Sequence, residues 1–117
     1  MATRLKENVE DAEKGTMKML LFRMAEEPKT PKLILAVMSR NRDKYLRMLV
    51  AENSHTSEPT LGKLGRDGDY DVKTRVLENP NTPDSTVVSM VNDADQRVSR
   101  EAETVLGWRI MRDMLRA

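Results

Sequence analysis

Residues 76–83, Val-Leu-Glu-Asn-Pro-Asn-Thr-Pro, decide the fold of this chain, because the same pattern returns at a spacing of 26 residues. The stretch 50–53, Val-Ala-Glu-Asn, matches 76–79, and 24–27, Met-Ala-Glu-Glu, matches more weakly. A repeat of this length buries its apolar side only against neighbouring repeats, so the copies must stack. The spacing therefore predicts a stack of short helical units.

Each copy keeps the same register through its whole length. After the tetrad comes a threonine, then two apolar residues, then an aspartate and a further apolar residue. Apolar residues at spacings of three and four are typical of amphipathic helices, so we predict two short helices in each copy. The matching sets are Thr30, Leu35, Met38, Asp43 and Leu46; Thr56, Leu61, Leu64, Asp69 and Val72; and Thr82, Val87, Met90, Asp95 and Val98.

Threonine and proline signal the start of the first helix in each copy. Thr82 is placed to accept a hydrogen bond from a first-turn amide, and Pro83 suits the first helical position, whose amide needs no intrahelical partner. Thr30 and Thr56 occupy the same register as Thr82. We therefore expect all three threonines at helix beginnings.

Polar residues also mark both ends of the second helix. Asp43, Asp69 and Asp95 are expected to cap its N-terminus, since an aspartate side chain accepts hydrogen bonds from first-turn amides. Asn53 and Asn79 are expected to end it, because asparagine tolerates the left-handed conformation that is common just after a helix. Each copy is thus two helices, or one helix and a shorter helical turn, joined by polar corners.

The segments at both ends fall outside the repeat and are expected to cover the exposed ends of the stack. The N-terminal segment is predicted to be an amphipathic helix broken near Gly15, and the C-terminal one a helix that carries Trp108. The predicted fold class is all-α, a short α-solenoid of three two-helix repeats in one domain. Its parts are an N-terminal cap at 1–23, repeats at 24–49, 50–75 and 76–101, and a C-terminal capping helix at 102–117.

The pattern quoted first, followed by Asn-Asp-Ala-Asp-Gln-Arg-Val at 92–98, resembles the leucine-rich repeat variant family, and the resemblance covers residues 24 to about 106. The resemblance implies a right-handed superhelix of alternating α-helices and 3₁₀ helices. Some family members carry an iron–sulfur cluster on a cysteine-rich module, which does not carry over because this chain has no cysteine. The first copy departs from the pattern, with Glu27 in place of the turn asparagine. No catalytic residue comes with the family.

Charge is abundant but balanced, with 20 Lys and Arg against 19 Asp and Glu and a formal net charge of +1. Electrostatic recognition must therefore come from a local patch. The absence of cysteine excludes a disulfide framework and a thiolate metal site. The chain shows neither the apolar core of a secretory signal nor an apolar run of the roughly 18 to 20 residues that span a bilayer. We expect a soluble, cytoplasmic protein with no membrane partner.

The sequence offers no catalytic or metal-binding constellation, so we expect a protein that is not an enzyme and has no cofactor. Asp67, Asp69 and Asp71 imitate the spacing of a calcium loop, but Val72 stands where such a loop needs glycine. The only histidine, His55, falls in a predicted turn. Nucleophilic catalysis by serine or threonine would need an oriented base beside it, and none is evident.

The favoured function is a noncatalytic interaction module that binds a protein partner, as stacked repeats generally do. Predicted contact residues lie outside the positions that the repeat core requires. Four of them are tyrosine, tryptophan or arginine, the residue types that dominate binding hot spots, and the fifth is a lysine. The five are Tyr45, Arg47, Tyr70, Lys73 and Trp108.

A nucleic-acid-binding solenoid is the alternative function. Basic residues recur at equivalent positions, and a ladder of them on stacked helices could follow a phosphate backbone. Against this interpretation, every copy also places aspartate nearby, and only 3% of residues are aromatic and able to stack on bases. The predicted phosphate contacts, besides Arg47 and Lys73, are Arg40, Arg42, Lys44, Arg66, Arg75, Arg97 and Arg100.

The C-terminal helix carries apolar residues on nearly every side. Met111 and Met114 lie near Trp108 in a segment that the repeat core does not require. Surplus apolar surface of this kind either folds back over the last repeat or meets a second molecule. A homodimer through this helix is therefore the alternative to an intramolecular cap.

Overall fold

The computed structural model describes the backbone of residues 2–116 and the side chains of residues 9–116. Residues 1 and 117, the outer limits of the two predicted caps, lie outside this range. Within it the chain is all-helical, with seven α-helices and no strand or 3₁₀ helix, so the alternation of α-helices and 3₁₀ helices that the resemblance implied is not found. The helices are α1 (Ala2–Glu26), α2 (Lys32–Met38), α3 (Lys44–Glu52), α4 (Glu58–Leu64), α5 (Tyr70–Glu78), α6 (Asp84–Met90) and α7 (Gln96–Arg116).

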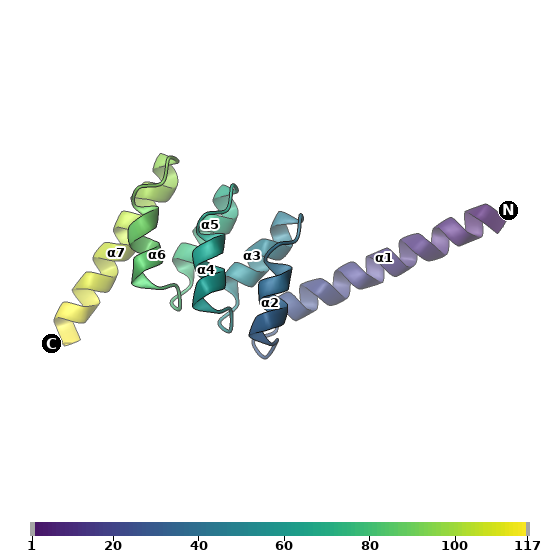
Figure 1. Cartoon of the computed structure of the whole chain (residues 1–117), viewed down its shortest axis with the longest axis horizontal. Helices are drawn as coiled ribbons and strands as arrows, with labels where there is room; N and C mark the ends of the chain where they lie inside the picture. The colour runs from purple at the N-terminus through teal and green to yellow at the C-terminus, as the bar shows by residue number, and fades with distance from the viewer. Residues whose placement is uncertain (1, 117) are drawn as a thin grey trace.

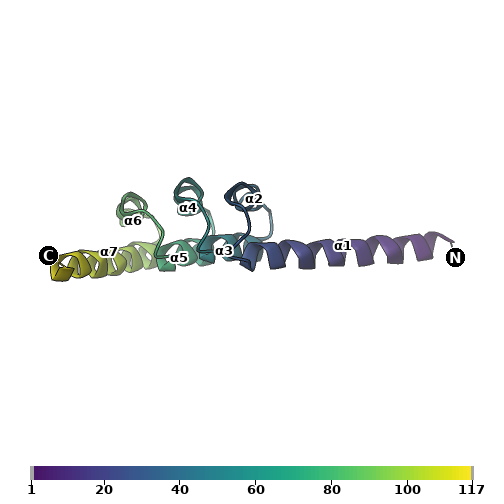
Figure 2. The ribbon, with the colours of Figure 1, turned by 90° about the horizontal axis from the view of Figure 1, so that it is seen from below.

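The helices form an extended row (Figure 1), and the molecule measures 69 × 30 × 17 Å. Helices α1, α3, α5 and α7 follow one another along the row, and the short helices α2, α4 and α6 lie on one side of it (Figure 2). Packing contacts join α1 to α3, α3 to α5 and α5 to α7. The prediction of an all-α fold is confirmed. None of the helices described is long and apolar enough to cross a membrane.

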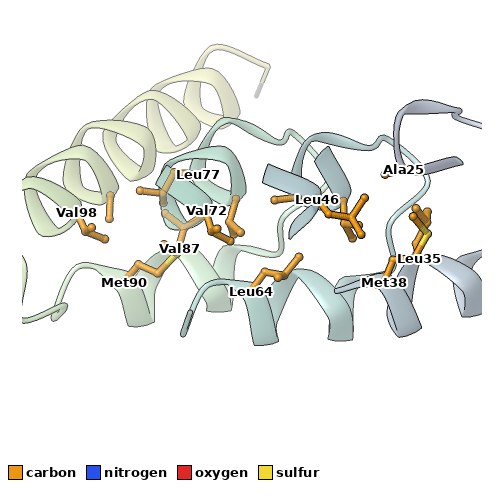
Figure 3. Close-up of a cluster of buried hydrophobic side chains, with 14 residues drawn as sticks. Ala25, Leu35, Met38, Leu46, Leu64, Val72, Leu77, Val87, Met90 and Val98 are labelled. Carbon is orange, nitrogen blue, oxygen red and sulfur yellow. The ribbon is translucent and has the colours of Figure 1, made fainter. Parts of the chain in front are cut away.

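Buried apolar side chains run along the inside of the row (Figure 3). They recur at the spacing of the sequence repeat, both on the short helices α2, α4 and α6 and on the helices of the row, α1, α3, α5 and α7, which we call the long helices. Burying each such aliphatic side chain stabilises the fold by about 1.5 to 3 kcal/mol. The matching positions, each no more than 1% exposed, are Leu35, Leu61 and Val87 on the short helices and Leu46, Val72 and Val98 on the long ones.

The repeat threonines do not cap the short helices, contrary to the prediction. Pro31 and Pro83 occupy the capping positions of α2 and α6 without a side-chain cap, whereas Ser57 caps α4. Each threonine hydroxyl instead donates backward to a carbonyl near the end of the preceding long helix. The last carbonyls of a helix lack intrahelical donors, so a buried hydroxyl is better used there. The pairs are Thr30 with Met24, Thr56 with Val50 and Thr82 with Val76.

The aspartate caps of the second helices are confirmed. Asp43 Oδ1 accepts from the amide of Tyr45 at 2.9 Å, and Asp69 Oδ1 accepts from the amide of Asp71 at 2.8 Å. Asp95 accepts in the same way from the amide two residues later, at 2.9 Å. These bonds satisfy first-turn amides and fix the start of α3, α5 and α7.

Asn53 and Asn79 end α3 and α5 as predicted, but not in a left-handed conformation, since their φ angles are −66° and −75°. Their side chains, not their backbone conformations, have the structural role. The side-chain amide of Asn53 donates to the carbonyls of Ala25 and Glu27 at 2.8 and 2.9 Å. The Asn79 amide makes the same two bonds one copy later, to Ala51 and Asn53, at 2.8 and 3.1 Å. Each buried asparagine thus joins two helix ends that are 26 residues apart.

Helix α1 is continuous, so the predicted break near Gly15 is wrong. A glycine in a helix interior costs about 1 kcal/mol relative to alanine, which weakens a helix without breaking it. The helix joins the rest of the molecule through its last turns, where Leu21 and Phe22 are half-buried and Ala25 is fully buried. Its N-terminal part extends away from the other helices (Figure 1).

Candidate functional site

Arg47 and Lys73, two of the predicted contact residues, connect neighbouring copies of the sequence repeat. Arg47 Nε lies 2.8 Å from Asp67 Oδ2, and Lys73 Nζ lies 2.7 Å from Asp93 Oδ2. Arg47 Nη1 also donates to the carbonyl of Asn41 at 2.9 Å. Both ion pairs are largely shielded, with side chains 11 to 18% exposed. These two basic residues are therefore engaged within the molecule.

The environment of Asp93 favours its charged form. The hydrogen bond from Lys73 is the main reason that the pKa of the Asp93 carboxyl lies below its ordinary value. Partial burial acts in the opposite direction, and the amide of Asp95, 2.9 Å from Asp93 Oδ1, adds to the lowering. The Asp93 carboxylate is thus held in its charged, hydrogen-bonded form at neutral pH.

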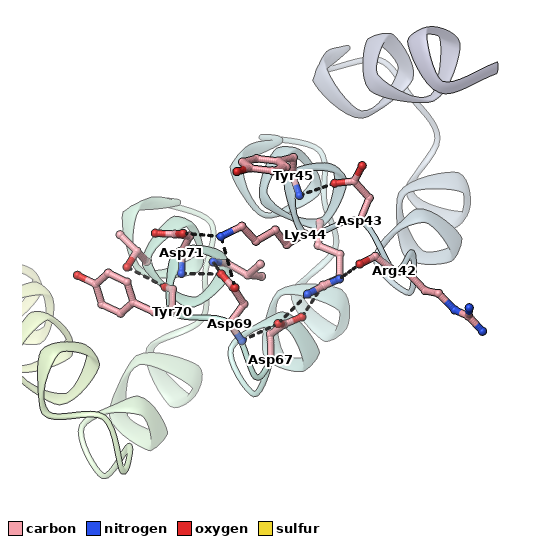
Figure 4. A network of polar contacts seen from close by, with 11 residues as sticks. Arg42, Asp43, Lys44, Tyr45, Asp67, Asp69, Tyr70 and Asp71 are labelled. Atoms are coloured by element: carbon pink, nitrogen blue, oxygen red, sulfur yellow. Dashed lines mark hydrogen bonds and ion pairs between the residues drawn. The ribbon is translucent and has the colours of Figure 1, made fainter. Parts of the chain in front are cut away.

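The aspartates that imitate a calcium loop each have a partner within the protein (Figure 4). Asp67 binds Arg47 and accepts from the amide of Asp69 at 2.9 Å. Asp69 caps α5, and Asp71 Oδ2 lies 3.1 Å from Lys44 Nζ. The cluster is explained by helix capping and by contacts between copies of the repeat.

Tyr45 is the second residue of α3 and Tyr70 the first residue of α5, so they lie at neighbouring positions of the repeat, and their surroundings differ. Tyr45 is 59% exposed, with Lys44 Nζ 5.3 Å from its ring centre. The pKa of Lys44 is raised above its ordinary value, mainly because its ammonium group donates a hydrogen bond to Asp71. Tyr70 is half-buried beneath the guanidinium carbon of Arg97, which lies 3.9 Å from the ring centre.

Arg97 belongs to a small surface cluster at the start of α7. Its Nη2 lies 2.7 Å from Asp95 Oδ2. Because this contact stabilises both charged groups, the pKa of Asp95 is lowered and that of Arg97 is raised. The guanidinium also covers the ring of Tyr70. Neither Tyr70 nor Arg97 is therefore a free contact residue.

The predicted basic ladder is divided between paired and exposed residues. Lys44 and Arg97 contact aspartates, and Arg75 Nε lies 3.0 Å from Glu52 Oε1. The remaining four are exposed, and among residues 9–116 no ion pair is recorded for them. Arg47 and Lys73, by contrast, are shielded in ion pairs. The four exposed members are Arg40, Arg42, Arg66 and Arg100.

The last turns of α7 expose a run of large apolar side chains. Trp108 is 66% exposed, Met111 51% and Leu115 82%. Their spacing of three and four residues places them on one face of the helix, away from Val98 and Ala102, which are fully buried. We call Trp108, Met111 and Leu115 the α7 face.

Arg109 is an important residue that sequence reasoning missed. Its side chain is only 11% exposed, and its guanidinium donates to the carbonyl of Thr82 at 2.6 Å and contacts Asp84 Oδ1 at 2.8 Å. It therefore fastens α7 to the start of α6. The signal was available, because Arg109 follows Ala102 and Val105 in the register that faces the core, where an isolated basic residue indicates a specific partner.

Arg109 also lines a polar groove of about 540 Å³ between the loops that precede α4 and α6 and helix α7. His55 and Asn81 contribute from the loops, and His55 Nδ1 is 2.8 Å from the carbonyl oxygen of Thr30. Both basic and acidic side chains line it, among them Lys32 and Glu58. The groove brings together residues distant in sequence, so the pattern of the chain gave no sign of it.

Among the residues described, no group of three or more histidine, cysteine, aspartate or glutamate side chains is arranged to hold a metal ion. The described residues thus offer structural ion pairs, a polar groove and the exposed apolar face of α7. Comparisons of the chain with protein-family models, with curated proteins and with solved structures found no match.

Proposed function

We propose that this chain is a right-handed α-solenoid of the leucine-rich repeat variant type that serves as a noncatalytic protein-binding scaffold. Recurrent features 26 residues apart support the solenoid. Leu35, Leu61 and Val87 are equally buried, and Asn53 and Asn79 make equivalent pairs of hydrogen bonds. Repeat stacks of this kind present extended surfaces for binding.

The exposed α7 face is the observation that carries the binding function. Trp108 and two other large apolar side chains lie together in water in the last turns of α7. Tryptophan is enriched in interface hot spots, and clustered exposed apolar residues mark interaction sites. The partner is a protein that presents an apolar ridge, such as one side of an amphipathic helix.

The ion pairs favour a protein over a nucleic-acid partner. A phosphate backbone would have to compete with Asp67 for Arg47 and with Asp93 for Lys73, at contacts of 2.8 and 2.7 Å. Only the scattered exposed arginines could meet phosphates freely. A protein partner at the α7 face needs no such rearrangement.

Affinity purification with the full chain, followed by quantitative binding of the recovered partner, tests this function. The triple variant Trp108→Ala/Met111→Ala/Leu115→Ala is expected to bind that partner at least about tenfold more weakly. Leu33→Ala/Val37→Ala is the matched control, because both side chains are also exposed and apolar but lie on α2. Equal recovery of the same partner by the triple variant and the parent would refute the proposal.

The test also separates a second copy from a foreign partner. If the α7 face forms a homodimer, light scattering of the parent gives a dimer mass that falls to the monomer mass in Trp108→Ala. A nucleic-acid function would instead give binding that weakens steeply with salt and with neutralisation of the exposed arginines.

A further inference from the structure

The N-terminal part of α1 is a helix with little support from the rest of the molecule. Every side chain from residue 9 to residue 20 is exposed, and Figure 1 shows the helix leaving the row. A helical segment of this length is marginal in water without tertiary packing. Gly15, near its middle, lowers its intrinsic stability further. The segment therefore lacks a covering partner.

Three exposed apolar residues of this segment and one threonine share one side of the helix. Val9, Ala12, Thr16 and Leu20 follow one another at spacings of three and four residues, and with Glu13 and Met17 they line one shallow hollow. At 3.6 residues per turn this side lies opposite Ala25, which packs inside the molecule. Val9 is 56% exposed and Leu20 is 49% exposed. We call Val9, Ala12, Thr16 and Leu20, with Glu13 and Arg23 beside them, the α1 face.

The charges of the α1 face are complementary to those of the same face on a second copy. Glu13 and Arg23 are ten residues apart on this side of the helix, and no ion pair of either is recorded among residues 9–116. A second α1 running antiparallel, centred on residue 18, brings each Glu13 to the Arg23 of the other copy. A parallel pair in register would place like charges together, which is destabilising.

The sizes of the side chains agree with the antiparallel register. The same centre places Thr16 opposite Leu20 and Ala12 opposite Met24, so that small residues face large ones. Alternation of small and large residues across an interface lets two helices interdigitate. In a parallel pair Leu20 would meet Leu20 and Ala12 would meet Ala12.

We propose that the partner of the α1 face is a second copy of this chain, bound as an antiparallel pair of α1 helices. The pairing is a symmetric two-fold contact, in which the same patch serves both subunits. The two helices overlap from residue 10 to residue 26, a length of about 24 Å at 1.5 Å per residue. The α7 face takes no part in it and remains available to another protein.

Charge exchange tests both the pairing and its direction. The full chain is followed by sedimentation from about 1 µM to about 500 µM, because an interface this small associates weakly. Glu13→Arg is expected to weaken dimerisation at least tenfold, and Glu13→Arg/Arg23→Glu is expected to restore it to within about threefold of the parent. Circular dichroism verifies that all three proteins remain helical. Trp108→Ala is the matched control and is expected to leave the dimer unchanged.

Each other outcome overturns the proposal. A parent chain that stays monomeric across the whole range has no α1 dimer. Equal dimerisation of the parent and the two charge variants indicates either a parallel pair or another surface. Loss of the dimer in Trp108→Ala, with no effect of Glu13→Arg, assigns self-association to the α7 face.

Cross-linking provides a second measurement of direction, and the absence of native cysteine removes background. A mixture of differently tagged Thr16→Cys and Leu20→Cys chains is expected to form mixed disulfide dimers preferentially under mild oxidation. A parallel pair would instead favour the disulfides of each variant with itself.

Discussion

The middle of the molecule and its two ends complete their helix contacts in different ways. In the middle, Asn53 and Asn79 end α3 and α5, and each donates two hydrogen bonds to the preceding copy. At the ends the same register holds Glu27 and Val105. Glutamate has no amide donor and valine has no polar atom, so this series of hydrogen bonds stops at both ends.

The ion pairs between copies stop at the same places. The register of Arg47 and Lys73 continues as Leu21 before them and Ser99 after them. Another molecule therefore cannot extend the row by repeating its internal bonds. The ends carry long helices with exposed apolar faces instead, and under the proposals above the middle serves stability and the ends serve association.

The largest loss of stability is expected from a change in the middle of the molecule, Asn79→Ala. The change leaves the carbonyls of Ala51 and Asn53 without their donor, and it removes the acceptor of the Asn81 amide. Because a buried unsatisfied polar group costs about 1 to 3 kcal/mol, the free energy of unfolding should fall by about 3 kcal/mol. Urea unfolding measures the loss.

Asn81→Ala is the matched control for this experiment. Asn81 is an exposed residue of the same type, and its side chain makes one hydrogen bond, to the carbonyl of Ser54 at 2.7 Å. Its replacement should cost less than about 1 kcal/mol. Equal losses in the two variants would show that the buried asparagines have no special part in joining the copies.

Lys73→Met should have a smaller, pH-dependent effect. The pKa of Asp93 is lowered in the folded protein, so the unfolded chain binds this proton more readily. The stability from Asp93 is therefore present above its ordinary pKa, near 4, and is lost as the pH falls through the lowered value. At pH 7 the variant should lose about 1 kcal/mol. That loss should shrink below about pH 4 in thermal unfolding followed across pH.

Lys63→Met serves as the comparison, since Lys63 is an exposed lysine on α4. It should change stability by less than about 0.5 kcal/mol at any pH. A loss in Lys73→Met that stays constant between pH 7 and pH 3 would show that packing of the lysine stem, not the ion pair with Asp93, is responsible.

Gly65→Ala probes the packing between short helices and should cost about 1 kcal/mol. A Cβ at Gly65 would lie 3.1 Å from Thr86 Cγ2 and 3.3 Å from Met90 Sδ, so the side chains of α6 must shift. Thermal unfolding measures the decrease. An unchanged or raised midpoint would mean that the side chains of α6 move to accommodate the added methyl group without loss of stability.

The sequence predicted the helices and their buried positions because the repeat fixes both at once. The period of apolar residues and the aspartate caps are local signals, and Leu35, Leu61 and Val87 are buried as their register required. The threonines were misplaced for a physical reason. A hydroxyl can cap the next helix or satisfy the previous one, and only burial decides between these uses.

The surface was harder to predict than the core. Arg47 and Lys73 were predicted to contact a partner, yet they bind aspartates twenty residues further along the chain. Such pairs depend on the distance between stacked helices, which the sequence does not state. Trp108 is exposed as a contact residue should be, and whether it binds a partner stays a prediction.

Gly15→Ala should have the smallest effect on global stability and so gives the sharpest contrast with Gly65→Ala. A Cβ at Gly15 meets nothing within 4 Å, and this part of α1 is not packed against the row. Alanine should therefore stabilise the helix locally by up to about 1 kcal/mol, which slows amide exchange near residue 15 severalfold. The midpoint of thermal unfolding of dilute protein should stay the same. A midpoint that rises instead would show that α1 unfolds together with the middle, and protection near residue 15 that grows with protein concentration would connect this helix to the pairing of two chains.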